Sequence, residues 1–318
     1  MTPQPGQFES NRFPIERFGG RGFDQAFVRV GIGGVPLLLV HGWPESKRIF
    51  WRVIEPLASA GFDVIVPDLR GFGDSGLAPD GRYDVPAHAE DLAALLEALG
   101  CDRVVLAGGD LGGPVIQELS LRRPDLVDRM AIFNSPLPYL KEHMASISGT
   151  RPPVEAADYF IRQGTDADAL IAELASPEQR RRYIATFYTS RFWAHPGTFD
   201  AAAVDFMTEP FADAARLRAS FANYEAAFDP HAPASVLGGR QNPTRCLILF
   251  GPSDHVIYPA FDRMAAAVFP DHVGPFLLRD CGHFVPWEAP HAFISALIAF
   301  CGDRLAPFRS SQVRSSQV

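Results

Sequence analysis

The chain has 318 residues, of which 47% are hydrophobic and 21% charged, an ordinary composition for a globular protein. This length exceeds that of most single domains but suits an α/β domain that carries an insertion. With 29 basic and 37 acidic residues the net charge is −8, and no long basic run is present, so a nucleic-acid partner is not expected.

The four cysteines are scattered along the chain, with no CxxC pair and no zinc spacing. They are Cys101, Cys246, Cys281 and Cys301. Three of them fall in or near apolar strand or helix patterns, where cysteine behaves as a small core residue. We therefore expect no metal, and we expect a reducing compartment, the cytoplasm.

Neither end of the chain shows a targeting or membrane segment. Residues 1–20 are polar and interrupted by proline and glycine, without the apolar centre of a signal peptide. No apolar stretch reaches the about 18–20 residues that span a bilayer, so no membrane partner is expected. The tail, residues 309–318, repeats Arg-Ser-Ser-Gln-Val and is predicted to be disordered.

The first part of the chain alternates strand and helix patterns. Two short strands are predicted over residues 13–18 and 25–30, with a hairpin-type turn nearby at residues 31–34. Apolar runs typical of buried strands follow at 36–40, 63–67, 103–106 and 130–133, and helical patterns lie at 50–60, 87–99 and 114–123. This alternation predicts a mostly parallel, doubly wound sheet.

The alternation stops after residue 135. Residues 139–235 are helical in pattern, rich in Ala, Arg and Phe, and contain no buried strand. Strand patterns resume at 246–250 and 275–278, and helical patterns at 258–268 and 290–301. We predict a helical cap, residues 139–235, inserted into an α/β core made of residues 1–138 and 236–308. The cap is expected at the carboxyl ends of the strands, where α/β sheets bind ligands.

Asp110 is the most informative residue. It lies in Ala107-Gly-Gly-Asp-Leu-Gly-Gly113, between a buried strand and a helical pattern, with glycine two residues before and after it. In one large class of hydrolases this spacing makes a sharp strand-to-helix elbow that lifts the central side chain clear of the backbone. That residue is usually serine, whereas a carboxylate can attack an sp³ carbon and form an alkyl ester. The alternative is ordinary turn chemistry, with Asp110 capping the next helix.

Two more polar residues follow strand patterns. Asp254 comes after residues 246–250 in Gly251-Pro-Ser-Asp254, and His283 comes after residues 275–278 in Asp280-Cys-Gly-His283. The order nucleophile, acid, histidine is that of the α/β-hydrolase triad. Each residue alone has a plain alternative: Asp254 as a loop-capping carboxylate, His283 as a structural histidine. The correct order at the correct strand ends favours the triad.

With these motifs the sequence resembles the α/β-hydrolase epoxide hydrolases over residues 10–305. The matching pieces are His41-Gly-Trp-Pro-Glu-Ser46, Pro67-Asp-Leu-Arg-Gly-Phe-Gly-Asp-Ser75, Gly109-Asp-Leu-Gly-Gly113, Gly251-Pro-Ser-Asp254 and Gly282-His-Phe-Val-Pro286. The resemblance implies an α/β-hydrolase fold with a helical lid and an epoxide opened to a diol through an ester on Asp110. In this fold the backbone amides of Trp43 and Leu111 form the oxyanion hole, and His41 and Pro44 support the loop.

In that family two lid tyrosines hold the epoxide oxygen. Tyr224, in Asn223-Tyr224, matches the second, and Tyr159, in Asp158-Tyr159-Phe160, matches the first less firmly. Tyr183 and Tyr188 lie in the same lid and compete with Tyr159. Any of these tyrosines can instead be a helix-packing residue, which is their commoner use.

The sequence also departs from related families. Haloalkane dehalogenases resemble the same scaffold but use a tryptophan after the nucleophile to bind halide, and fluoroacetate dehalogenases carry an arginine there. This chain has Leu111 instead. Asn134 stands where some dehalogenases place their acid, which leaves Asp254 in that role.

The expected function is therefore hydrolysis of a small apolar epoxide by water, with no cofactor, in a monomer or homodimer. Dehalogenation on the same scaffold is the alternative. A ligand-binding homologue without catalysis is a third possibility, which the intact triad disfavours.

Overall fold

An eight-stranded sheet forms the centre of the molecule. The computed structural model describes residues 8–137, 154–237, 239–257 and 259–305. The strands are β1 Glu16–Gly20, β2 Phe23–Val30, β3 Val35–Val40, β4 Phe62–Pro67, β5 Val104–Gly109, β6 Val127–Phe133, β7 Cys246–Phe250 and β8 His272–Leu277. Their order in the sheet is β1-β2-β4-β3-β5-β6-β7-β8. The pairs β1-β2 and β2-β4 are antiparallel, and all the other neighbouring pairs are parallel.

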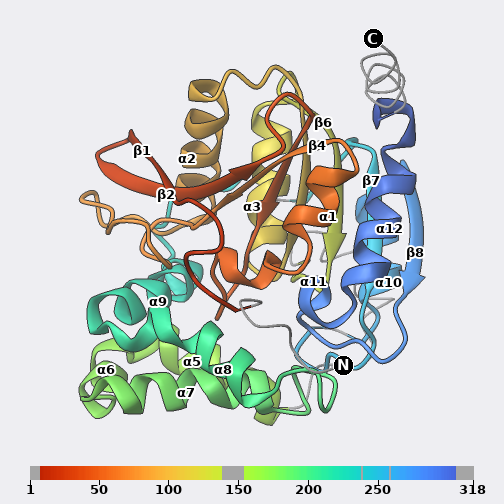
Figure 1. The fold of residues 1–318 in the computed structure, drawn as a ribbon. Helices are drawn as coiled ribbons and strands as arrows, with labels where there is room; N and C mark the ends of the chain where they lie inside the picture. Colours follow the sequence, from red (N-terminus) through yellow and green to blue (C-terminus); the bar gives the residue numbers. More distant parts are fainter. Residues whose placement is uncertain (1–7, 138–153, 238, 258, 306–318) are drawn as a thin grey trace.

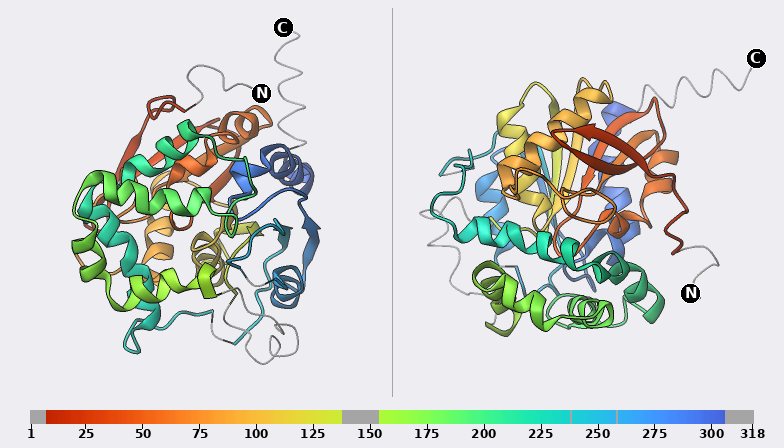
Figure 2. Two further views of the ribbon diagram at one scale, coloured as in Figure 1. Left: turned by 90° about the horizontal axis from the view of Figure 1, so that it is seen from below. Right: turned by 90° about the vertical axis from the view of Figure 1, so that its left-hand side faces the viewer.

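Helices cover both faces of this sheet. The core helices are α1 Ile54–Ser59, α2 Val85–Ala98, α3 Gly112–Arg122, α10 Phe261–Val268, α11 Val285–Glu288 and α12 Pro290–Phe300, preceded by the 3₁₀ turn η1 Lys47–Phe50. Figure 2 shows α2 and α3 packed together on one face, with α1 and α12 on the other. Because both faces are covered, the central strands β4 and β5 are buried along their whole length, as parallel strands normally are.

The strand order reverses at the junction between β3 and β5. From β3 the chain first adds β4 on one side, then returns to place β5 on the other side. The carboxyl ends of two such strands leave a crevice between their loops, which is where open α/β sheets bind ligands. The loop after β3 begins at His41 and the loop after β5 begins at Asp110, so the fold brings these two segments to one point.

A group of helices lies beyond the carboxyl ends of the strands, in a separate layer at the bottom of Figure 1. It consists of α5 Val154–Thr165, α6 Ala167–Glu173, α7 Pro177–Thr189, α8 Ala201–Thr208, the 3₁₀ turn η2 Glu209–Ala212 and α9 Ala214–Phe228. Ser176 starts α7 with a capping box, in which its hydroxyl accepts from the Gln179 amide and the Gln179 side chain accepts from the Ser176 amide. This layer is the helical cap. The predicted boundaries at 138/139 and 235/236 stay predictions, and residues 138–153 and the tail lie outside the described residues.

Some local expectations need correction. The predicted turn at residues 31–34 is present, with the Gly34 amide donating to Gly31 O at 3.0 Å. It does not close a hairpin, because β2 pairs with β1 and β4 and not with β3. The hairpin turn is at Arg21-Gly22, where both residues have positive φ, as the tight turns that match strand twist require. Of the predicted helix over 50–60, only residues 54–59 form a helix, α1, because η1 ends at Phe50 and residues 51–53 are a turn. The strand β5 extends to Gly109 because Gly108 and Gly109 pair with β6.

The four cysteines are free and buried. Among the described residues, none of the helices combines the length and the apolar character needed to cross a bilayer.

Candidate active site

Asp110 occupies the elbow between β5 and α3 in a left-handed backbone conformation, with φ +44°. Few residues other than glycine adopt this conformation, so surrounding contacts must hold it. The Asp110 amide donates to Asn134 O (2.9 Å), and Ser135 Oγ donates to Asp110 O (3.0 Å). A Cβ at Gly108 would lie 2.7 Å from Gly112 O, so the spacing of small residues in the sequence reflects a real close approach of the two backbones.

The loop after β3 contacts the Asp110 carboxylate directly. The Trp43 amide donates to Asp110 Oδ1 at 2.7 Å. Gly42 has to be glycine here, because a Cβ would lie 2.4 Å from Asp110 Cβ. The crevice at the sheet's reversal point therefore holds a carboxylate with one oxygen fixed by a backbone N–H. For Leu111, no hydrogen bond from its amide to this carboxylate is present among the described residues, so its role in the oxyanion hole stays a prediction.

His283 lies between two carboxylates. Its Nδ1 is 2.8 Å from Asp254 Oδ2, and its Nε2 is 3.4 Å from Asp110 Oδ2, an ion-pair distance without the geometry of a hydrogen bond. Burial alone would lower the pKa of His283, but the charges of Asp254 and Asp110 raise it well above its ordinary value. The structure thus brings together the three residues that the sequence predicts as a triad.

Asp254 is held in place on both of its oxygens. The Val256 and Ile257 amides donate to Oδ1 at 2.7 and 3.1 Å. The Asn134 side-chain amide donates to Oδ2 at 2.9 Å, on the same oxygen that meets His283. A buried carboxylate with these partners can orient the imidazole and stabilise its protonated form.

His41 has a structural position. The Leu69 amide donates to its Nε2 at 3.0 Å, so Nδ1 carries the proton and donates to Gly42 O at 2.8 Å. Burial lowers the pKa of His41, consistent with this neutral form. The ring therefore connects the loop after β3 to the loop after β4, and its supporting role stays a prediction. Pro44 lies in the same loop, and its carbonyl accepts from the Tyr188 hydroxyl.

Among the described residues of the cap, Tyr159 and Tyr224 are the tyrosines that pack against Trp43. The Tyr159 ring stacks on the Trp43 indole (5.1 Å, 10°), and the Tyr224 ring meets it edge-on (5.7 Å, 81°). Burial, followed by the charge of Asp110, raises the pKa of Tyr159 well above its ordinary value. Burial also raises that of Tyr224, with contributions from Tyr159 and Asp110. Both phenols therefore stay protonated beside the Asp110 carboxylate.

The two competing tyrosines are engaged elsewhere. The Tyr183 hydroxyl accepts from Gln163 Nε2 at 2.8 Å, and burial raises its pKa to about 12. The Tyr188 hydroxyl donates to Pro44 O from a buried position. This arrangement favours Tyr159 over both as the partner of Tyr224, although the roles of all four stay predictions.

Sequence reasoning missed several residues of this site. From the sequence, Asn134 was notable only because some dehalogenases have their catalytic acid at this position. In the structure its buried side-chain amide donates to Asp254 and to the carbonyls of Gly251 and Gly282. Trp193 of the cap lies with its ring 4.7 Å from that of His283. Glu45 lies within the motif His41–Ser46, from which no role for this side chain was predicted.

Glu45 is a buried carboxylate next to the Asp110 loop. The Gly42 amide donates to its Oε2 at 2.6 Å. Burial raises its pKa to about 7, against the partly opposing effects of His283 and of this hydrogen bond. It is therefore a group whose charge changes near neutral pH inside the core.

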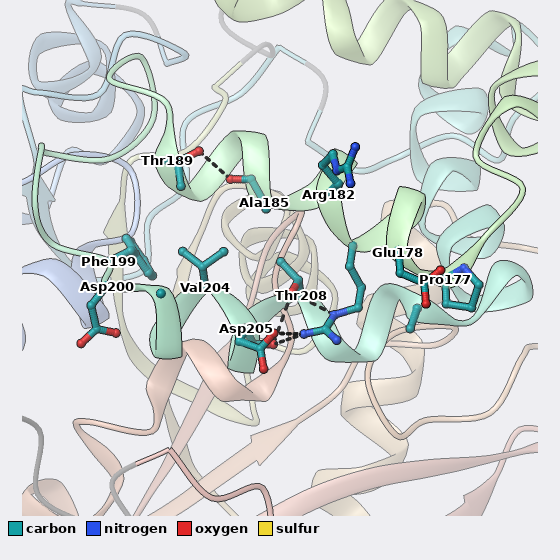
Figure 3. Close-up of a pocket in the computed structure, with 13 residues that line it drawn as sticks. Pro177, Glu178, Arg182, Ala185, Thr189, Phe199, Asp200, Val204, Asp205 and Thr208 are labelled. Carbon is teal, nitrogen blue, oxygen red and sulfur yellow. Dashed lines mark hydrogen bonds and ion pairs between the residues drawn. The ribbon is translucent and has the colours of Figure 1, made fainter.

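A surface groove of about 660 Å³ lies between α7 and α8 (Figure 3). Charged side chains line much of it, including the ion pair of Arg181 with Asp205, and no triad residue reaches it. The chemistry described above is therefore not located in this groove. In the described part of the chain, no group of three or more His, Cys, Asp or Glu is arranged to hold a metal ion.

A family model described as the alpha/beta hydrolase fold matches residues 35–290. The chain belongs to the α/β-hydrolase fold family. A solved structure of an epoxide hydrolase without ligand superposes with a TM-score of 0.77 at 24% identity, covering 92% of this chain and 99% of that one. An epoxide hydrolase from an endophytic Streptomyces superposes with a TM-score of 0.74 at 22% identity, covering 91% and 95%. These two likenesses confirm the fold.

Two curated relatives extend over most of the chain. The soluble epoxide hydrolase of Corynebacterium sp. (strain C12) is 28% identical over 297 residues, which is 91% of this chain and 96% of that protein. The epoxide hydrolase of Caballeronia sordidicola is 27% identical over 289 residues, 84% and 87% of the two chains. A haloalkane dehalogenase of Bradyrhizobium diazoefficiens is 34% identical, but over 50% of this chain and 51% of its own. The resemblance to epoxide hydrolases inferred from the motifs is confirmed.

The buried Glu45 gives a prediction about stability. The folded protein binds the proton of the Glu45 carboxyl more tightly than the unfolded chain does. The contribution of Glu45 to stability is therefore fully present below pH 4.5 and is lost as the pH rises to about 7. The pKa of Glu45 rises from 4.5 to about 7, a difference of about 2.5, which corresponds to on the order of 3 kcal/mol of unfolding free energy. Glu45→Gln should therefore gain stability relative to the wild type across this window.

Urea unfolding of both proteins at a series of pH values measures this difference. The same exchange at the exposed Glu97 controls for the loss of one negative charge. A difference between the wild type and Glu45→Gln that stays constant from pH 4.5 to 8 contradicts the prediction.

Proposed function

We propose that the protein is an epoxide hydrolase that opens a small apolar epoxide to a vicinal diol through an ester on Asp110. The observation that carries the proposal is the Asp110 carboxylate at the elbow: it faces His283 of the His283–Asp254 pair, and it accepts from the amide of Trp43, against which two cap tyrosines pack. The two curated relatives that span most of the chain are both named epoxide hydrolases. A serine at this position would favour acyl transfer, whereas a carboxylate suits attack on an sp³ carbon.

In the first step Asp110 attacks one carbon of the epoxide ring. The Trp43 amide holds Oδ1, which leaves Oδ2 as the attacking oxygen. As the new C–O bond forms, the C–O bond of the ring breaks, and its oxygen takes a proton from a tyrosine hydroxyl. Tyr159 and Tyr224 suit this role because their raised pKa values keep them protonated.

In the second step water hydrolyses the ester. Esterification removes the charge of Asp110, one of the two charges that raise the pKa of His283. His283 then gives up its proton more readily, to the tyrosinate left by the first step, while Asp254 continues to orient the ring. His283 Nε2 takes a proton from water, and the resulting hydroxide attacks the Asp110 carboxyl carbon. The oxyanion forms on Oδ1, beside the Trp43 amide, with the Leu111 amide as the proposed second donor. The bond between the carboxyl carbon and the esterified oxygen then breaks, the departing diol oxygen takes the proton from His283, and the Asp110 carboxylic acid returns a proton to His283.

The residues around the site suit an apolar substrate. Phe187 packs edge-on against Trp43 (4.8 Å), and Trp193 packs against Tyr159 (5.1 Å). Such a wall excludes bulk water and so limits proton exchange during the first step. The mechanism needs no cofactor. Whether the protein is a monomer or a homodimer, and whether it is cytoplasmic, stay predictions.

Dehalogenation is the second candidate, since one relative over half of the chain is a haloalkane dehalogenase. The same carboxylate could displace a halide, but Leu111 follows Asp110 where that family resemblance implies tryptophan. An assay of diol from a panel of small epoxides, with halide release from haloalkanes and haloacetates measured beside it, decides between the two. Diol without halide supports the proposal, and halide without diol overturns it.

His283→Gln should still alkylate but should not release product, because the histidine acts mainly in the second step. Intact-protein mass spectrometry is expected to show a mass equal to protein plus epoxide, and digestion should place the adduct on the peptide that contains Asp110. The same exchange at His272, on the edge strand β8, should leave turnover unchanged. A folded His283→Gln protein without any adduct, with a substrate that the wild type converts, contradicts the two-step mechanism.

Tyr224→Phe should slow alkylation, since a positioned general acid contributes typically about 10²–10⁴-fold. The loss should fall below that range if Tyr159 shares the proton donation, and the double change Tyr159→Phe with Tyr224→Phe should then be nearly inactive. Quenching of tryptophan fluorescence in stopped flow follows this step, with Trp43 as the expected reporter.

Tyr183→Phe is the matched control, because that hydroxyl is bonded to Gln163 and not to the site. Alkylation at the wild-type rate in Tyr224→Phe, with an unchanged melting temperature, would assign this tyrosine to packing alone.

A further inference from the structure

Glu288 organises the loop that carries His283. The Gly282 amide donates to Glu288 Oε2 and the Phe284 amide to Oε1, both at 2.9 Å. The Glu288 carboxylate therefore accepts hydrogen bonds from the backbone amides of the residues immediately before and after His283. The His283 amide between them donates to Trp193 O at 2.7 Å. Three consecutive backbone amides around the histidine are thus held by one carboxylate and one cap carbonyl.

The same carboxylate also reaches the cap. The His195 amide donates to Glu288 Oε2 at 2.7 Å, so a single oxygen joins a cap amide and a loop amide. The two segments lie so close that a Cβ at Gly282 would be 2.4 Å from Trp193 O. A displacement of the cap segment around residues 193–195 would therefore be transmitted to the histidine loop.

The position of the imidazole depends on this backbone. Its Nδ1 must meet Asp254 Oδ2, and its Nε2 must face the Asp110 carboxylate. A side chain that makes two directed contacts can satisfy both only while its backbone is fixed. A misplacement of about 1 Å at such a group can cost about 10²-fold in rate.

We propose that Glu288 is a positioning residue that fixes the backbone of His283 and couples it to the cap. The kinetic part of this inference rests on the proposed function, whereas the positional part does not. A carboxylate that only stabilised the fold would slow both chemical steps equally when changed. A positioning residue for His283 slows ester hydrolysis more than alkylation, because the histidine acts in hydrolysis.

Glu288→Gln is the informative variant. An amide side chain keeps one acceptor oxygen but turns an NH₂ group toward at least one of the three backbone amides, so part of the array is lost without a change in volume. Glu288→Asp, which keeps the charge but shortens the reach, is the second variant. Glu118→Gln is the matched control: Glu118 is also buried and accepts from the Val236 amide (3.0 Å) and Ser235 Oγ (2.6 Å), away from the histidine loop.

Two measurements test the proposal. Single-turnover kinetics with an epoxide that the wild type converts should show hydrolysis of the alkyl-enzyme about 10-fold or more slower in Glu288→Gln, with alkylation changed less than about 2-fold. Proton NMR should show the low-field signal of the His283 Nδ1–H broadened or lost in Glu288→Gln. Glu288→Asp should shift both measurements in the same direction, and Glu118→Gln should change neither.

Equal slowing of both steps, or an unchanged imidazole signal in folded Glu288→Gln, overturns the proposal. If Glu288→Gln does not fold, Glu288→Asp decides by the same two criteria. If the wild type forms no diol from any epoxide, the proposed function fails on its own, and the NMR comparison alone decides whether Glu288 positions the histidine.

Discussion

The Asp110 carboxylate, buried at the crevice between β3 and β5, is the group on which the rest of the site depends. A buried carboxylate is costly unless its oxygens find partners. Here the Trp43 amide meets one oxygen and His283 faces the other. The unusual backbone conformation that lifts Asp110 to this point is held by Asn134 and Ser135 from the end of β6. The loops after β3, β5 and β6 are thus fixed to one another through a single residue.

The cap completes the site from the other side. Tyr159, Tyr224 and Trp193 form an aromatic layer that covers Trp43 and the His283 ring. Sealing the site with rings and not with charges keeps the surroundings of Asp110 apolar, which strengthens the attraction between its carboxylate and His283. Tyr159 and Tyr224 are the phenols that we propose as proton donors to the epoxide oxygen. Trp193 and His195 also bind the histidine loop, through the His283 amide and the Glu288 carboxylate, so the cap and this loop are fixed to each other.

The sequence predicted the parts of this site that lie at strand ends. The elbow, the order Asp110, Asp254, His283 and the supporting histidine all follow from short motifs next to apolar runs. The choice of Tyr159 over Tyr183 and Tyr188 needed the packing around Trp43, because all three lie in similar helical patterns. Asn134 could not be predicted because its partners are distant in sequence. Glu288 could not be predicted because its partners are backbone amides, which leave no motif in the sequence. The misplaced hairpin has the same origin: local turn residues do not show which strands pair.

In the mechanism that we propose, Asp110 becomes covalently esterified, and water attacks the ester and not the epoxide. A single turnover in ¹⁸O-labelled water, with enzyme in excess over epoxide, tests it directly. We expect an unlabelled diol, whose new oxygen comes from Asp110, and ¹⁸O in the carboxylate of the peptide that contains Asp110. Label in the diol after the first turnover, with an unlabelled Asp110 peptide, would rule out the ester on Asp110 and make His283 the base for direct attack of water on the epoxide.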